Sequence, residues 1–227
     1  MSKFILFIFL SWLTGNPIVA VIIILAVYLA IDRRYYGFVP DPLRAFRIAG
    51  RIRELERIIA INPHDARSLK ELGIFMVEKK NYRKALEYFA RASSKMSDDP
   101  EFNYYYGIAA ARNGDVDKGR MLVDNALSAS PGLKYGDPYL EMAEAYIDAG
   151  SYDKAEPLLE QFLRIRLSSS RGLYQMGLVK IKTGKMDEGK ECLRKAVSVF
   201  RDSPRYKRKT ERNWAWKAKL LLMSGRY

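Results

Sequence analysis

A small residue recurs about every 34 positions, and this period constrains the fold of the chain more than any other feature of its sequence. The recurring residues each follow a large apolar or aromatic residue, are separated by 34, 36 and 34 positions, and are Gly73, Gly107, Ala143 and Gly177. A second set of small residues repeats the same steps 12 positions further on, at Ala85, Gly119, Ala155 and Gly189. Because two columns agree, the sequence predicts a repeated structural unit.

The residues between and after these columns predict two helices joined by a short turn in each unit. Small side chains in both columns allow two helix backbones to approach closely. Gly114, Gly150 and Gly184 lie between the columns, where a helix commonly ends in a left-handed residue. Apolar residues follow at helical spacing, as at Ala85 and Phe89.

At these positions the chain resembles the tetratricopeptide repeat family, whose 34-residue signature is W-x2-L-G-x2-Y in the first helix and A-x3-F in the second. Leu69-x2-Leu72-Gly73 matches the first part, and Ala85-x3-Phe89 matches the second. Four repeats fit within residues 66–204, at 66–99, 100–135, 136–169 and 170–203. The resemblance implies an all-α fold, a right-handed α-solenoid of stacked helix pairs.

The segments on either side of the repeats are expected to extend the stack. Residues 43–63 look like a second helix without its partner, which predicts a half-repeat inside a linker segment at 37–65. Residues 205–227 are rich in basic side chains and are expected to form a capping helix that covers the last apolar face.

Four features depart from the family pattern. Asn103 replaces a large apolar residue at the start of the second repeat, and Phe162 replaces a small residue in the third. Pro157 lies inside the second helix of the third repeat, and two extra residues fall within 132–136. We therefore expect irregular packing in the third repeat and a longer loop before it.

The resemblance also implies a concave face, formed by the first helices, that holds peptides or partner helices. By repeat position, the residues expected to line this groove are Lys70, Ile74, Val77, Tyr104, Ile108, Arg112, Leu140, Glu144, Ile147, Tyr174, Leu178 and Lys182. Packing between repeats is the competing explanation for the apolar ones. Family members that bind chaperones clamp a terminal carboxylate with Lys and Asn, whereas here Ile74 stands in the Asn position, so chaperone binding is not indicated.

Residues 4–31 contain no ionisable side chain, and about 20 apolar residues suffice for a helix to cross a bilayer. We expect a membrane anchor in residues 1–36, with one transmembrane helix at 13–31 and a bend at Gly15-Asn16-Pro17. A cleaved secretory signal is the first alternative, but the run is too long and has no suitable cleavage site. A helical hairpin pivoting at the same tripeptide is the second, although its arms are short for two crossings.

The chain carries a formal net charge of +13, and most of the excess lies outside the repeats. Residues 58–200 contribute +2, residues 33–57 contribute +4 and residues 201–227 contribute +7. Basic residues after the apolar run favour a cytoplasmic location for the repeats. The two basic ends suit contact with anionic lipid, whereas a nucleic-acid groove requires a continuous basic stripe, so nucleic-acid binding is not indicated.

Neither catalysis nor metal binding is indicated. The sequence has no Gly-rich phosphate loop, and its single cysteine, Cys192, and single histidine, His64, cannot supply a zinc cluster. We therefore expect a protein without a cofactor or enzymatic activity.

The function expected is that of a scaffold or adaptor, anchored by a single pass in a bacterial inner membrane, that binds a protein or peptide partner at the cytoplasmic face. The architecture resembles that of anchored tetratricopeptide regulators of bacterial envelope biogenesis, but this chain lacks their carboxy-terminal cysteine-rich metal module. The alternative is a receptor or assembly subunit of a membrane translocation or envelope-biogenesis complex.

Overall fold

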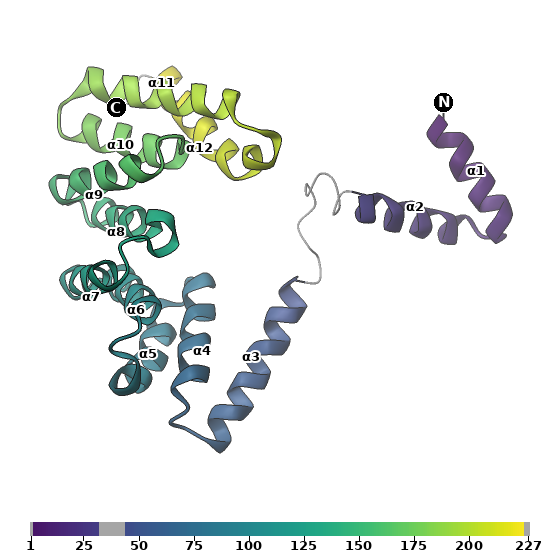
Figure 1. The fold of residues 1–227 in the computed structure, drawn as a ribbon. Coiled ribbons are helices and arrows are strands. Elements are labelled where there is room, and N and C mark those ends of the chain that lie inside the picture. Colours follow the sequence, from purple (N-terminus) through teal and green to yellow (C-terminus); the bar gives the residue numbers. More distant parts are fainter. Residues whose placement is uncertain (1, 32–43, 225–227) are drawn as a thin grey trace. The chain divides into compact units, whose positions relative to one another are not determined.

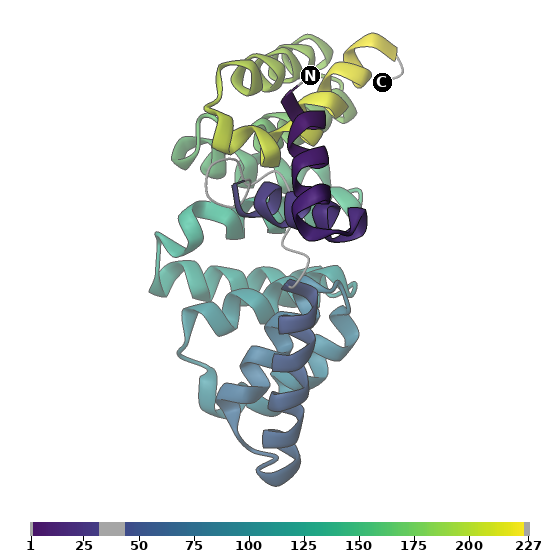
Figure 2. The same ribbon diagram turned by 90° about the vertical axis from the view of Figure 1, so that its right-hand side faces the viewer.

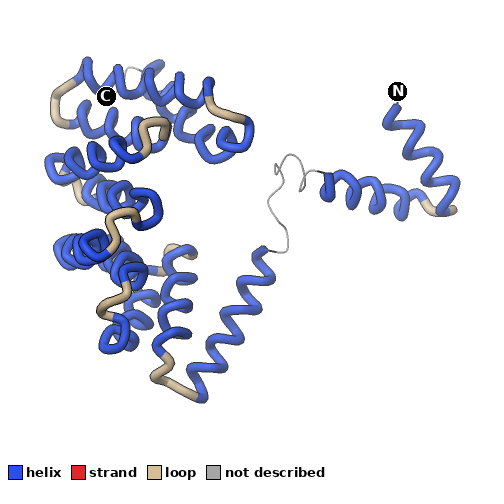
Figure 3. The backbone as a smooth tube through the Cα atoms, in the orientation of Figure 1, coloured by secondary structure: helices blue, strands red, loops and turns tan. Residues whose placement is uncertain are grey.

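A computed structural model describes residues 2–31 and 44–224 of the chain. The chain divides into two compact units, Met1–Arg44 and Ala45–Tyr227. Every regular element in the described ranges is a helix (Figure 3), which confirms the all-α fold class. The linker residues predicted at 37–43, and the arginines at 33 and 34, lie outside the described residues.

The N-terminal unit contains two short helices, α1 (Ser2–Thr14) and α2 (Pro17–Ile31). Between them Gly15 adopts a left-handed φ of 67°, which glycine accepts without steric cost. Asn16 then begins α2, because its Oδ1 accepts a hydrogen bond from the backbone N–H of Ile18 at 2.9 Å. The chain thus bends at the tripeptide where a bend is predicted.

The predicted single helix at 13–31 is not formed. Leu13 belongs to α1, and the residues at 15 and 16 interrupt the backbone hydrogen bonding between the two helices. Across residues 2–31 and 44–224, none of the helices combines the length and the apolar character that crossing a membrane requires.

The second unit begins with a single helix, α3 (Arg44–Ile61), and continues as four helix pairs (Figure 1). The pairs are α4 (Ala66–Glu78) with α5 (Tyr82–Met96), α6 (Pro100–Arg112) with α7 (Val116–Ala129), α8 (Asp137–Asp148) with α9 (Tyr152–Ile165), and α10 (Ser170–Lys182) with α11 (Met186–Asp202). A last helix, α12 (Arg205–Ser224), packs on both α10 and α11. Figure 2 shows the same stack from the side.

The helices of a pair approach closely at the small residues that define the repeat. A Cβ atom added at Gly107 would lie 2.8 Å from the carbonyl oxygen of Gly119, and one added at Gly119 would lie 2.7 Å from the carbonyl oxygen of Gly107. Both glycines are therefore required by the close contact of α6 with α7. Consecutive first helices are also in contact, α4 with α6, α6 with α8 and α8 with α10, and so form one continuous face.

The turn inside each pair depends on one left-handed residue. Gly114, Gly150 and Gly184 have φ values of 107°, 74° and 83°, as the sequence pattern predicts. In the first repeat the same position is Lys80, which has a φ of 57°. A non-glycine residue pays a steric cost in this conformation.

The third repeat is irregular where the sequence departs from the family pattern. The two extra residues lie in a short 3-10 helix, η2 (Leu133–Gly136), which precedes α8. Phe162 is fully buried, and its ring fills the space left by the missing side chain of Gly172, since a Cβ there would lie 2.5 Å from the ring. Pro157 lies inside α9 without ending it.

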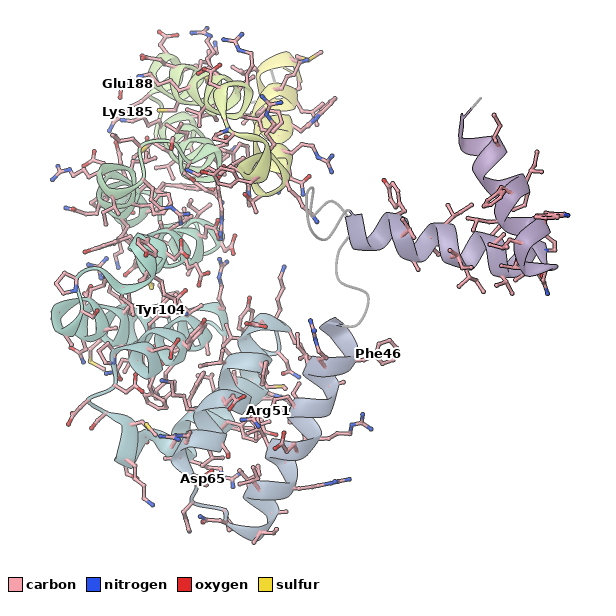
Figure 4. The ribbon with its side chains drawn as sticks, turned by 45° about the vertical axis from the view of Figure 1, so that its right-hand side comes forward. Phe46, Arg51, Asp65, Tyr104, Lys185 and Glu188 are labelled. Atoms are coloured by element: carbon pink, nitrogen blue, oxygen red, sulfur yellow. The ribbon has the colours of Figure 1, made fainter. Side chains whose placement is uncertain are left out.

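The outer helices close the apolar core at its two ends. From α3, Leu55 is buried against the first pair, whereas Phe46 is 75% exposed. Arg51 of α3 reaches α4 (Figure 4), where its guanidinium pairs with Glu71 at 2.7 Å. From α12, Ala218 is fully buried against the last pair, as expected for a capping helix.

Candidate partner-binding groove

A groove of about 720 Å³ runs along the first helices of the solenoid and is bounded at one end by α12. Eight of the predicted residues line it: Val77, Tyr104, Ile108, Arg112, Glu144, Ile147, Tyr174 and Leu178. They come from α4, α6, α8 and α10, so the repeat register places one face of each first helix on this groove.

Four predicted residues do not line the groove. Leu140 is only 2% exposed and belongs to the central core, and Ile74 packs against the core of the first repeat. Lys70 is engaged by Asp99 at 2.6 Å, and Lys182 is exposed elsewhere on α10. By helical spacing each of these residues lies on the same face as a lining residue one or two turns away, so the repeat position identifies the face but not how far the groove extends along it.

Two lining residues also serve the core. Tyr104 and Ile108 are 2% and 3% exposed, and both pack in the central cluster of buried side chains. The competing explanation, packing between repeats, therefore accounts for much of their burial. The more accessible side chains, Ile147, Tyr174 and Leu178, are those that a partner can reach.

The groove has an ionic centre at Glu144 on α8. Arg171 donates two hydrogen bonds to it, from Nε at 2.7 Å and from Nη2 at 2.6 Å, and Gln175 donates a third at 2.9 Å. Arg112 donates a fourth at 3.0 Å and also pairs with Asp148. The network joins three consecutive first helices, α6, α8 and α10.

The guanidinium groups determine the ionisation of Glu144. Burial penalises its charged form, but the hydrogen bonds and positive charge of Arg171 outweigh burial and lower the pKa of the carboxyl. The pKa of Arg171 is raised, because the same carboxylate outweighs the burial of the guanidinium. Glu144 is therefore held as a carboxylate.

Glu141 has the opposite surroundings, although it lies on the same helix. Burial raises the pKa of its carboxyl, and the single hydrogen bond from the Tyr104 hydroxyl at 2.8 Å does not offset that effect. The pKa of Tyr104 is itself raised, chiefly by burial. Both members of this pair line the groove, as Glu144 does.

The end of the groove at α12 is aromatic and basic. The rings of Tyr174 and Trp214 lie 5.6 Å apart. The ammonium of Lys217 lies 4.3 Å from the centre of the Trp214 ring, and the Arg171 guanidinium lies 5.6 Å from it, both within the range of cation–π attraction.

Several residues that line the groove were not predicted from the sequence, although the spacing of the acidic residues in α8 could have identified three of them. The acidic lining residues of α8 recur at helical spacing, as Asp137, Glu141, Glu144 and Asp148. Steps of 4, 3 and 4 residues place all four on one face of a helix. The repeat register does not assign Trp214 and Lys217 to the groove, because α12 lies outside the repeat pattern.

Cys192 and His64, the single cysteine and the single histidine of the sequence, do not line the groove. Across the described residues, no three His, Cys, Asp or Glu side chains cluster in a way that could hold a metal ion. Cys192 is half-buried, and burial raises the pKa of its thiol. His64 is exposed in the turn before α4.

Known structures share this fold. A crystal structure of MamA protein is 20% identical, with a TM-score of 0.60, over 77% of this chain and 90% of that chain. The MamA of Desulfovibrio magneticus RS-1 is 21% identical, with a TM-score of 0.53, over 71% of this chain and 97% of that chain. TTC0263, a thermophilic repeat protein of Thermus thermophilus, is 19% identical, with a TM-score of 0.55, over 78% of this chain and 93% of that chain. At these identities the likeness is one of fold alone.

One curated relative is similar in sequence, a "BBSome complex member BBS4 homolog" of Drosophila melanogaster, which is 26% identical over 160 residues. The match includes 66% of this chain but spans only 33% of that protein's length.

Three family models, each described as a tetratricopeptide repeat, match residues 77–133, 110–172 and 170–203. The last match has the same bounds as the fourth predicted repeat. Together the matches run without interruption from residue 77 to residue 203, which is more than half of the chain. The helix pairs, their left-handed turns and these matches agree, and the chain belongs to the tetratricopeptide repeat family.

Proposed function

We propose that this protein is a scaffold that binds a peptide or helix of a partner protein in the groove along its first helices. The observation that carries this proposal is the groove itself, which extends over successive helix pairs and presents accessible aromatic and aliphatic side chains. Grooves of this kind accept extended or helical segments, because the partner buries apolar side chains along their whole length.

A binding role fits the groove better than a catalytic one. The carboxylate at its ionic centre, Glu144, is engaged by four hydrogen bonds from neighbouring side chains, so it is a structural element rather than an available acid or base. The Drosophila relative is named as a member of a complex, which supports a role in protein assembly.

We also propose that the N-terminal unit holds this scaffold at a membrane, with the repeats on the cytoplasmic face of a bacterial inner membrane. The support comes from the sequence. Residues 4–31 contain no ionisable side chain, and the stretch that follows is rich in arginine. Attachment to a surface raises the effective concentration of partners on the same surface, so modest affinity in the groove is sufficient.

The groove is tested by a double variant, Tyr174→Ser with Leu178→Ser, which removes two accessible lining side chains. The matched control is Met121→Ser with Leu167→Ser, which removes two side chains that are 56% and 79% exposed and do not line the groove. Circular dichroism first checks that both variants are folded.

Partners are then identified by cross-linking and affinity purification of the full chain from membranes, and the crosslinked segment is synthesised as a peptide. We expect the groove variant to bind this peptide at least about tenfold more weakly than the unmodified chain, which corresponds to about 1.4 kcal/mol. The control variant should bind it as the unmodified chain does. Equal binding by all three proteins would place the partner on another surface.

A further inference from the structure

The N-terminal unit exposes many large apolar side chains. Its large hydrophobic side chains that are at least 40% exposed are Ile5, Ile8, Phe9, Trp12, Leu13, Ile18, Val19, Val21, Ile22, Leu25, Val27 and Tyr28. Scattered exposed side chains are normal, but a continuous apolar surface of this kind indicates a surrounding medium or partner that is itself apolar.

The exposure extends around α2 rather than along one stripe. Ile18, Val19, Val21 and Val27 point in different directions around the helix, since each residue turns it by about 100°. Among the described side chains of α2, only Ala20 is fully buried, at the contact with α1. A helix that rests on a membrane surface needs a polar face, and α2 has none, so it requires apolar surroundings on almost every side.

The lengths of the helices exclude a crossing by either one. With 13 and 15 residues, α1 and α2 are about 20 and 22 Å long, because an α-helix rises about 1.5 Å per residue. The hydrocarbon core of a bilayer is about 30 Å thick. Each helix is long enough to cross one leaflet at a tilt but too short to cross both.

The bend between the helices is suited to an environment without water. The Thr14 hydroxyl donates to the carbonyl oxygen of Leu10 at 2.7 Å and lies 3.1 Å from that of Asn16. The Asn16 side chain accepts from the N–H of Ile18, and its carbonyl oxygen accepts from the N–H of Ala20 at 3.2 Å. Internal hydrogen bonds of this kind lower the cost of placing a turn in hydrocarbon.

Basic residues stand on both sides of the apolar run. Lys3 precedes it, and Arg33 and Arg34 follow it in the sequence. Charges of the same sign at both ends favour placing both ends at the same anionic headgroup layer.

We infer that α1 and α2 insert together into one leaflet of a lipid bilayer, with the bend at residues 15–16 deepest, so that the amino terminus and the repeats lie on the same side. This inference rests on the proposed membrane location and defines how the membrane is engaged. The occupant of the apolar surface is therefore the acyl chains of a single leaflet, and the topology differs from that of a single-pass anchor.

The test labels cysteines in the full chain, in membrane vesicles of both orientations, with a maleimide that cannot cross membranes. The natural cysteine is removed by Cys192→Ala, and one reporter is introduced per protein, either Ser2→Cys or Ser128→Cys in the repeats. Ser128 is exposed on α7. We expect both reporters to be labelled in one vesicle orientation and both to lose labelling in the other.

A second variant tests whether the bend sets this topology. Gly15→Leu, Asn16→Leu and Pro17→Leu together remove the left-handed residue, the cap and the proline. A continuous apolar helix of residues 2–31 is then about 45 Å long, enough to span the bilayer. We expect the Ser2→Cys reporter to move to the side opposite Ser128→Cys in this variant.

Each result has a defined meaning. If the two reporters lie on opposite sides of the membrane in the chain with the natural residues 15–17, the inference is overturned, while membrane attachment stands. If the triple-leucine chain also keeps both reporters on one side, the bend does not determine the topology and the inference is wrong on that point. A chain found as a soluble oligomer would overturn both the inference and the proposed membrane location, because a second copy would then cover the apolar surface.

Discussion

Glu141 and Glu144 lie three residues apart on α8 and line the same groove, yet they are held in opposite ways. Glu144 accepts hydrogen bonds from two guanidinium groups, whereas Glu141 accepts one from the Tyr104 hydroxyl. Burial alone would raise the pKa of both carboxyls. The arginines overcome it and lower the pKa of Glu144, whereas the pKa of Glu141 remains raised. Their contributions to stability should therefore depend on pH with opposite signs.

Replacing the well-paired carboxylate should destabilise the repeats. Glu144→Gln leaves Arg112 and Arg171 without their common anion, and we expect a loss of about 2–4 kcal/mol in the free energy of unfolding at pH 7. Because the folded-state pKa of Glu144 lies below its ordinary value of 4.5, the stabilisation is present above pH 4.5 and disappears as pH falls through the lowered pKa. Urea unfolding of the detergent-solubilised chain at pH 7 and pH 3 measures both effects.

A matched change at the surface provides the control. Glu191→Gln removes one partner of the exposed Glu191–Lys195 pair on α11, and exposed pairs of this kind contribute little. Its unfolding midpoint should equal that of the unmodified chain. If both variants lose the same stability, the network at Glu144 has no special role.

The neighbouring substitution should have the opposite result. Glu141→Gln keeps an acceptor for the Tyr104 hydroxyl but removes a charge that burial disfavours. Because the folded-state pKa of Glu141 is raised, its favourable contribution exists below pH 4.5 and is lost as pH rises through that raised pKa. We expect the variant to be more stable than the unmodified chain at pH 7 and no more stable at pH 4. A less stable variant at pH 7 would show that the carboxylate is better solvated in the groove than its burial indicates.

The fold was largely predictable because the determining contacts are local and recur. Gly107 and Gly119 stand 12 residues apart in the sequence, and their mutual contact can be inferred from the spacing alone. The same holds for the left-handed turn residues at 114, 150 and 184. Each of these features depends only on the two helices that contain it.

The groove was less predictable because it depends on which positions neighbouring side chains cover and on contacts beyond the repeat. Leu140 and Glu144 are one turn apart on the same face of α8, but Leu140 is packed in the core whereas Glu144 lines the groove. Trp214 reaches the groove because α12 folds back on α10, and the sequence predicts this capping helix but not which of its side chains reach the groove. The continuous helix predicted at 13–31 failed for a local reason, the left-handed Gly15 next to a helix cap.

The first repeat carries a conformational cost that can be removed. Lys80 has a φ of 57° at the position that is glycine in the other three repeats. Lys80→Gly removes the steric cost of a left-handed non-glycine residue, but glycine also gives the unfolded chain more conformational entropy. The net effect should stabilise the protein by about 0.5–1 kcal/mol. The control is Lys79→Gly, because Lys79 has a φ of −81° and gains nothing from glycine. Urea unfolding of both variants measures the difference, and equal effects at the two positions would refute the explanation.

The close contact between α6 and α7 predicts that one methyl group is enough to disturb the stack. In Gly107→Ala, the new Cβ would meet the carbonyl oxygen of Gly119 at 2.8 Å and Val123 at 2.9 Å, and the backbone oxygen cannot move aside as a flexible side chain can. We expect a loss of about 1–3 kcal/mol in the free energy of unfolding, the usual cost of overpacking. The same change at Gly50, inside α3 with open space around its Cβ position, should instead stabilise by up to about 1 kcal/mol, because alanine favours helix. Both values come from urea unfolding, and a Gly107→Ala protein as stable as the Gly50→Ala protein would mean that the two helices can separate without cost.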